Sequence, residues 1–109
     1  IMDEIFKQFE NWFLSKKDTW KRNDIVVDEA GLSEFGHQYW IILHSNNGLG
    51  NIVLYESNGY YWVDFESGNY DCGIIFQRAG IEFYSINELD IYEKDFCINF
   101  MWIYYVKPC

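Results

Sequence analysis

Three acidic residues, Glu56, Asp64 and Glu66, fall close together in the middle of the chain. Asn58-Gly59 lies between Glu56 and the other two. This dipeptide strongly indicates a β-hairpin, because both residues tolerate the positive φ of a type I′ turn. Asp64 and Glu66 are two residues apart, so they share one face of the second strand. Paired carboxylates can act as acid and base, but a short hairpin offers no deep cleft for them. We therefore interpret all three as an acidic edge that faces solvent or a partner, with no catalytic residue among them.

Two histidines, His37 and His44, flank a single predicted strand. Their separation places them on opposite faces, so a shared metal site or a catalytic pair is not expected. The serines fit no nucleophile elbow, and the glycines form no phosphate-binding loop. The sequence therefore predicts a protein that is not an enzyme and that needs no metal or cofactor.

The three cysteines, Cys72, Cys97 and Cys109, fit no zinc or redox motif. We expect Cys72, in a strand pattern, and Cys97, in a helical pattern, to act as small core residues, and Cys109 to be a free thiol. This usage favours a reducing compartment. The first part of the chain is charged throughout, and no apolar run reaches the ~18 residues of a transmembrane helix. A cytoplasmic protein without a membrane segment is expected.

The charge is strongly negative, with 17 acidic and 8 basic residues, a net charge of −9 and a pI near 4.4. Direct binding of nucleic acid needs a basic surface and is not expected. Such a charge suits a basic protein partner, which it would attract over a distance. It would also serve simply to keep an aromatic-rich protein soluble.

Aromatic residues make up 21% of the chain, more than one core of this size is expected to hide. In the hairpin, Tyr61, Val63 and Phe65 should face the core, while the alternate positions point outward. That outward face would serve as a protein-binding surface, as a platform on which sugar rings stack, or only as cross-strand pairs that stabilise the sheet. The candidate partner-binding residues are Glu56, Tyr60, Trp62, Asp64, Glu66 and Trp40, with Tyr55 or Tyr70 as further members of the face.

The remaining pattern predicts the elements that must position these residues. Apolar residues at three- and four-residue spacing indicate an amphipathic helix over 3–18 and another over about 86–104, the second opened by a Ser85–Glu88 capping box. This second helix has an extra apolar edge formed by Ile91, Ile98 and Trp102, which predicts contacts on two of its sides. Loops are expected at 30–36 and 45–50. Strands are expected at 24–28, at 38–44, on both sides of Asn58-Gly59 within 51–66, and at 70–79.

This order predicts a single α+β domain over residues 1–109. Strands joined in succession by short turns form an antiparallel meander, here of about five strands. The N-terminal and C-terminal helices both carry apolar stripes, so we expect both to pack on one face of the sheet and leave the other face open.

The runs Gly50–Gly59 and Asp64–Gly68 resemble the TriTu-type immunity proteins of bacterial polymorphic toxin systems, which include contact-dependent growth inhibition. In that family a Gly-apolar-x-apolar-aromatic-Glu-Ser hairpin precedes an acidic strand that ends Glu-Ser-Gly. A helix lies on either side of these strands, and the similarity extends from about Ile5 to Met101.

The resemblance implies a cytoplasmic immunity protein, an antitoxin that binds the C-terminal toxin domain of its cognate effector. Such toxins are often nucleases with basic substrate sites, so Glu56, Asp64 and Glu66 would pair with Lys or Arg of the toxin. Trp62 and Tyr60 would fill its grooves. The alternative is a small ligand- or carbohydrate-binding module that uses the aromatic face. Toxin binding should depend on salt, whereas sugar binding should not.

Overall fold

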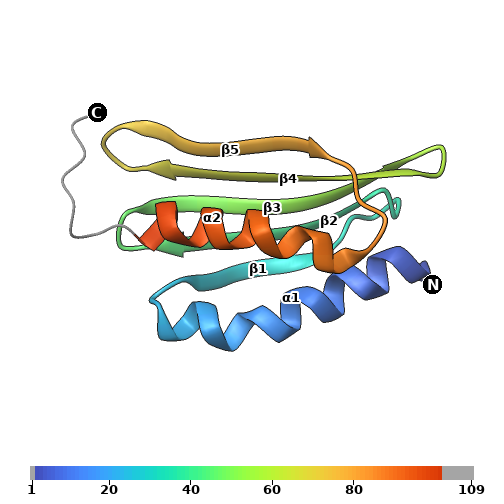
Figure 1. Ribbon diagram of the computed structural model, residues 1–109, viewed down its shortest axis with the longest axis horizontal. Helices are drawn as coiled ribbons and strands as arrows, with labels where there is room; N and C mark the ends of the chain where they lie inside the picture. The colour runs from blue at the N-terminus through green and yellow to red at the C-terminus, as the bar shows by residue number, and fades with distance from the viewer. Residues whose placement is uncertain (1, 102–109) are drawn as a thin grey trace.

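The computed structural model describes residues 2–101 and has the predicted α+β architecture (Figure 1). A five-stranded sheet follows an N-terminal helix and precedes a C-terminal one. The elements are α1 (Glu4–Arg22), β1 (Val26–Leu32), β2 (Gln38–Ser45), β3 (Gly48–Ser57), β4 (Tyr60–Asn69), β5 (Gly73–Ile81), the 3₁₀ helix η1 (Ile86–Leu89) and α2 (Asp90–Met101).

The sheet is the predicted antiparallel meander, because each strand pairs with the next in the order β1-β2-β3-β4-β5. The turn between β3 and β4 has the geometry that Asn-Gly favours. Asn58 has a φ of 51° and Gly59 a φ of 81°, so both adopt the positive φ of a type I′ turn. This turn fixes the register in which Tyr55 lies opposite Trp62.

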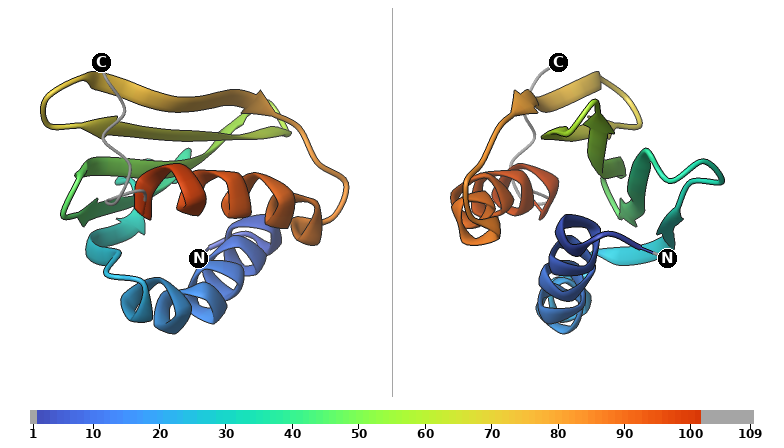
Figure 2. Two further views of the ribbon diagram at one scale, coloured as in Figure 1. Left: turned by 60° about the vertical axis from the view of Figure 1, so that its left-hand side comes forward. Right: turned by 90° about the vertical axis from the view of Figure 1, so that its right-hand side faces the viewer.

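Both helices cover the same face of the sheet, as predicted, and the sheet curves around them (Figures 1 and 2). α1 contacts β1, and α2 contacts β4 and β5. Alternation along the strands explains the layering. Tyr39, Ile41 and Leu43 of β2 are buried beneath the helices, and so are Val63 and Phe65 of β4. The helices complete this core with Phe6, Phe9, Trp12, Phe13, Trp20, Leu89, Phe96 and Phe100.

The first helix and the first strand are both longer than predicted. α1 continues to Arg22, and its last turns bury Trp20, which is 1% exposed. β1 begins at Val26 and runs to Leu32, through part of the predicted loop. Pairing with β2 extends this strand, and the irregularity in register between Val27 and Glu29 lets it continue.

The loop predicted at 45–50 is instead a tight turn, because β2 ends at Ser45 and β3 starts at Gly48. A glycine is required at this start, since a Cβ on Gly48 would lie 1.7 Å from the carbonyl oxygen of Gly68. Gly50, also in this strand, makes room for the helix layer: a Cβ there would lie 3.0 Å from Phe96 Cζ.

The later element boundaries also move by a few residues. β5 starts at Gly73 rather than at 70, because the Asn69 side chain accepts from the backbone N–H of Asp71 and of Cys72 and holds a turn there. The Ser85–Glu88 capping box is present as predicted. It opens η1, a 3₁₀ turn that α2 then continues, and the predicted last residues of this helix, 102–104, lie outside the described range.

Candidate interaction face on the open side of the sheet

The face of the sheet opposite the two helices carries most of the candidate residues. We call it the outer face and define it by Trp40, Val53, Tyr55, Trp62, Asp64 and Glu66. The register builds it in rows: Trp40 lies opposite Val53, Val53 opposite Asp64, and Tyr55 opposite Trp62. No helix of residues 2–101 lies over these rows (Figure 2). Val53 is nevertheless only 8% exposed, so the larger side chains around it form a continuous layer.

Tyr55 and Trp62 stack on each other near the turn of the β3–β4 hairpin. Their ring centroids are 5.5 Å apart and their planes differ by 13°. Both side chains are partly exposed, so the stack presents aromatic surface to solvent while each ring restrains the other. Burial raises the pKa of Tyr55, and the nearby Asp64 and Glu66 raise it further. The Tyr55 hydroxyl therefore stays protonated beside two carboxylates and is available as a donor.

The two carboxylates of the outer face are held by the neighbouring strand. Asp64 Oδ1 accepts from the backbone N–H of Gly80 at 2.7 Å, and Glu66 Oε2 accepts from Gln77 Nε2 at 2.9 Å. One oxygen of each carboxylate is thereby fixed to β5, and both groups keep a defined position beside the rings. The arrangement offers negative charge next to flat aromatic surface, which suits the binding of a cationic group.

The structure separates Glu56 from the other candidates. Glu56 lies opposite Tyr61. It follows the buried Ile52 and Leu54 at alternate positions of β3, so its side chain is on the helix side of the sheet. Its carboxylate accepts from Gly59 N at 3.0 Å and meets His37 Nδ1 at 2.7 Å. The hydrogen bond from the Gly59 N–H, followed by that with His37, lowers the pKa of Glu56. These two contacts tie the Glu56 carboxylate to the turn.

Tyr60 and the second histidine lie at the margins of the outer face. Tyr60 follows the turn directly and is 71% exposed. His44 Nδ1 lies 2.7 Å from Asp28 Oδ1, at the irregular part of β1. His37 contacts Glu56 on the helix side of the sheet, whereas His44 shares the alternation of Trp40, so the two histidines lie on opposite faces, as predicted. The carboxylate partners of the histidines were not predicted from the sequence. The His44–Asp28 pair depends on the irregular register of β1, which has no clear signal in the sequence.

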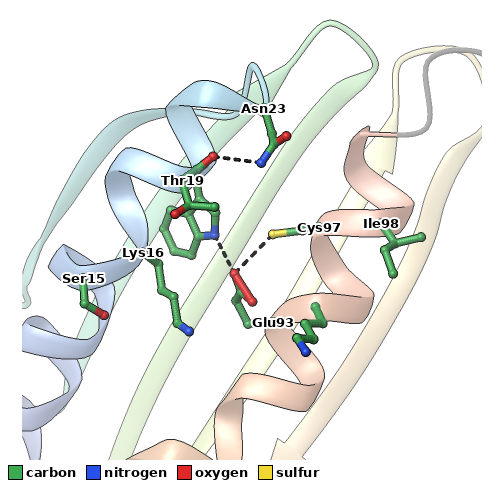
Figure 3. A pocket seen from close by; sticks show the side chains of 9 residues that line it. Ser15, Lys16, Thr19, Asn23, Glu93, Cys97 and Ile98 are labelled. Carbon is green, nitrogen blue, oxygen red and sulfur yellow. Dashed lines mark hydrogen bonds between the residues drawn. The ribbon is translucent and has the colours of Figure 1, made fainter.

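A second feature, a groove between α1 and α2, was not anticipated (Figure 3). At its base Trp20 Nε1 donates to Glu93 Oε1 at 2.9 Å, and Glu93 is only 7% exposed. The signal was available in the sequence: Glu93 stands in the apolar stripe between Leu89 and Phe96. Cys97 also contacts Glu93, and burial followed by the Glu93 charge raises the pKa of its thiol.

The predicted roles of the cysteines hold only in part. Cys97 is partly buried against the core, as expected, and its thiol is free. Cys72 lies in the turn before β5 and takes part in a disulfide, so its prediction as a reduced core residue in a strand is wrong. The argument from the cysteines for a reducing compartment therefore loses its support. Cys109 lies outside the described residues.

The comparisons with known proteins found no matching family model, no matching curated protein and no matching solved structure. Among the described residues, no group of three or more His, Cys, Asp or Glu side chains is arranged to hold a metal ion. None of the helices in that range is both long enough and apolar enough to cross a membrane.

Proposed function

We propose that this chain is an immunity protein that binds and neutralises a cognate toxin domain in the cytoplasm. The toxin would be a basic nuclease, blocked by steric and electrostatic occlusion. The observation that carries the proposal is the outer face, where the Tyr55–Trp62 stack adjoins Asp64 and Glu66 on a sheet surface that α1 and α2 leave open. The resemblance of 50–59 and 64–68 to TriTu-type immunity proteins supplies the kind of partner.

The chemistry of the outer face fits a basic partner. An Arg or Lys side chain of the toxin would lie against Trp62 and reach the free oxygens of Asp64 and Glu66. Tyr60 and Trp40 would contact apolar and polar surface around it, as aromatic anchors commonly do at interfaces. The net charge of −9 would raise the rate of encounter. Glu56, committed to the turn, would act indirectly by holding Tyr60 in place.

The experiment that tests this function is co-expression with the toxin domain encoded next to the gene, with a tag on only one of the two proteins. We expect a stable one-to-one complex and rescue of cell growth. A folded chain that neither co-purifies with that domain nor restores growth would refute the pairing. A catalytically inactive toxin variant should still co-purify, because occlusion does not require turnover.

A carbohydrate-binding module is the second candidate, and the Tyr55–Trp62 stack is the observation that favours it. Two nearly parallel, partly exposed rings can receive the flat face of a sugar. Oligosaccharide binding should then change the fluorescence of Trp62 and be insensitive to salt. Toxin binding should instead slow as ionic strength rises. A Trp62→Phe variant identifies which tryptophan gives the signal.

A further inference from the structure

The groove between α1 and α2 is a cavity of about 420 Å³, within the range of sites that hold small ligands. Its walls combine polar and apolar groups from both helices. Figure 3 shows Lys16 and Thr19 from α1 facing Glu93 and Cys97 from α2 across it. Ile98, which is 57% exposed, supplies apolar surface at the rim. The groove lies on the helix side of the sheet, so it is separate from the outer face.

The carboxylate of Glu93 lies at the base of this cavity. Trp20 Nε1 and Cys97 Sγ both donate to the same oxygen, Oε1, at 2.9 and 3.5 Å. Both donors are neutral. Within residues 2–101 nothing donates to the second oxygen, Oε2, and no cation pairs with Glu93. Oε2 lacks a hydrogen-bond partner but is not one of the fully buried atoms, so it is the oxygen that opens to the cavity. A carboxylate on a residue that is only 7% exposed is normally paired with a cation, because burial of a lone charge is costly.

The two lysines that line the groove are not that cation. Lys16 Nζ is held by Asp90 at 3.0 Å. Lys94 is exposed and forms no ion pair with a described residue. A metal ion is also a poor fit, because the 2–101 range offers no set of three ligating groups here and the walls include Trp20 and Ile98. An alkyl chain fits these walls, and its charged end fits Glu93.

We propose that the groove is a binding site for an alkylammonium or alkylguanidinium group, with Glu93 as the counter-charge and the methyl groups of Thr19 and Ile98 as contacts for the alkyl chain. The cation would reach Oε2 while Trp20 and Cys97 keep Oε1. A free amine or a Lys or Arg side chain of another protein both carry this chemistry. The site is independent of the proposed toxin binding, because it uses no residue of the outer face.

The test is a titration of the ¹⁵N-labelled chain with n-butylammonium and n-butylguanidinium, followed through the indole N–H signal of Trp20. Trp20→Phe assigns that signal. We expect a saturable shift with a Kd of about 1 mM, as is reasonable for one ion pair and a short alkyl chain. Neutral n-butanol and sodium chloride of equal ionic strength should leave the signal in place. A blocked peptide with one Lys distinguishes a protein side chain from a free amine as the source of the cation. The peptide shifts the Trp20 signal if a protein side chain can enter the groove, and it leaves the signal unchanged if only a free amine fits.

Glu93→Gln removes the charge but keeps an oxygen that can accept from Trp20. It should weaken binding at least about tenfold. Asp95→Asn is the matched control, since it removes the same charge from an exposed site on α2 and should bind as the unaltered chain does. The proposal is overturned if the Trp20 signal does not respond to either cation, or if n-butanol moves it equally. An equal response in folded Glu93→Gln would overturn it too. The comparison with n-butanol needs no variant, so it decides the matter even if Glu93→Gln does not fold.

Discussion

Asp90 links the two helices through one neutral and one charged contact. Trp12 Nε1 donates to Asp90 Oδ1 at 2.8 Å, and Lys16 Nζ lies 3.0 Å from the same oxygen. Burial by itself would raise the pKa of Asp90, but the hydrogen bonds from Trp12 and Lys16 outweigh it and the pKa is lowered. The ionised form is therefore favoured in the folded chain.

Asp90→Asn should accordingly destabilise the fold at neutral pH, by less than about 1 kcal/mol because Asp90 is partly exposed. A group with a lowered pKa stabilises above its unfolded value of 3.8 and loses this contribution as pH falls through the folded pKa. The difference between the two proteins in urea unfolding should therefore shrink toward about pH 3. A difference that grows on acidification would contradict this assignment.

Ser67 is fully buried in β4, and its hydroxyl is the one buried side-chain oxygen or nitrogen among the described residues without a hydrogen-bond partner. Removal of an unsatisfied buried group is commonly neutral or favourable. Ser67→Ala should leave the free energy of unfolding unchanged or raise it by up to about 1 kcal/mol. Chemical denaturation measures this, and a loss of more than about 1 kcal/mol would show that the hydroxyl is in fact satisfied.

Local sequence rules were sufficient for some residues of the site and insufficient for others. Strand alternation placed Trp62, Asp64 and Glu66 on one face, because it depends only on neighbours in the chain. The buried pair of Trp20 and Glu93 spans most of the sequence, and only the packing of one helix against the other brings it together. The separation of Glu56 from that face follows from the same alternation on β3, counted back from the turn.

The elements themselves followed from periodicity and turn residues, while their ends followed from contacts between elements. Both helices, the five strands and the Asn58-Gly59 turn were predictable, since each has a strong local pattern. The extension of β1 to Leu32 was not, because pairing with β2 decides where that strand stops. Likewise, the last turn of α1 was not predictable, because it is stabilised by the burial of Trp20 against other elements.

Gly48 is the position at which the β3–β4 pairing tolerates no side chain. Gly48→Ala would place a Cβ against the backbone of Gly68, which cannot yield without breaking the pairing. We expect a loss of at least about 3 kcal/mol in the free energy of unfolding, or failure to fold. Gly31→Ala is the control, because its Cβ would make an ordinary contact of 3.7 Å with Trp40. Equal thermal stability of the two variants would be inconsistent with this close approach.

Across the whole molecule, the fold divides the surface into two chemically different sides. Both helices lie on one side of the sheet and leave the other side open (Figures 1 and 2). The helix side contains the groove with the carboxylate of Glu93, and the open side presents aromatic rings with two fixed carboxylates. The net charge of −9, to which every carboxylate contributes, acts at long range, whereas the direct contacts of Asp64 and Glu66 reach only a partner bound to the outer face. Two variants of equal charge therefore separate general attraction from specific contact.

The most direct measurement compares the toxin-domain affinity of Asp64→Asn/Glu66→Gln with that of Asp18→Asn/Asp95→Asn at low salt. Both double variants lose two negative charges, and the first retains side-chain oxygens that can accept from Gly80 and Gln77. Asp18 and Asp95 are exposed on the helices. The outer-face variant should bind about ten- to a hundredfold more weakly, through faster dissociation, and the helix variant should lose only association rate. Equal affinity of the two folded variants would show that the toxin does not bind at the outer face.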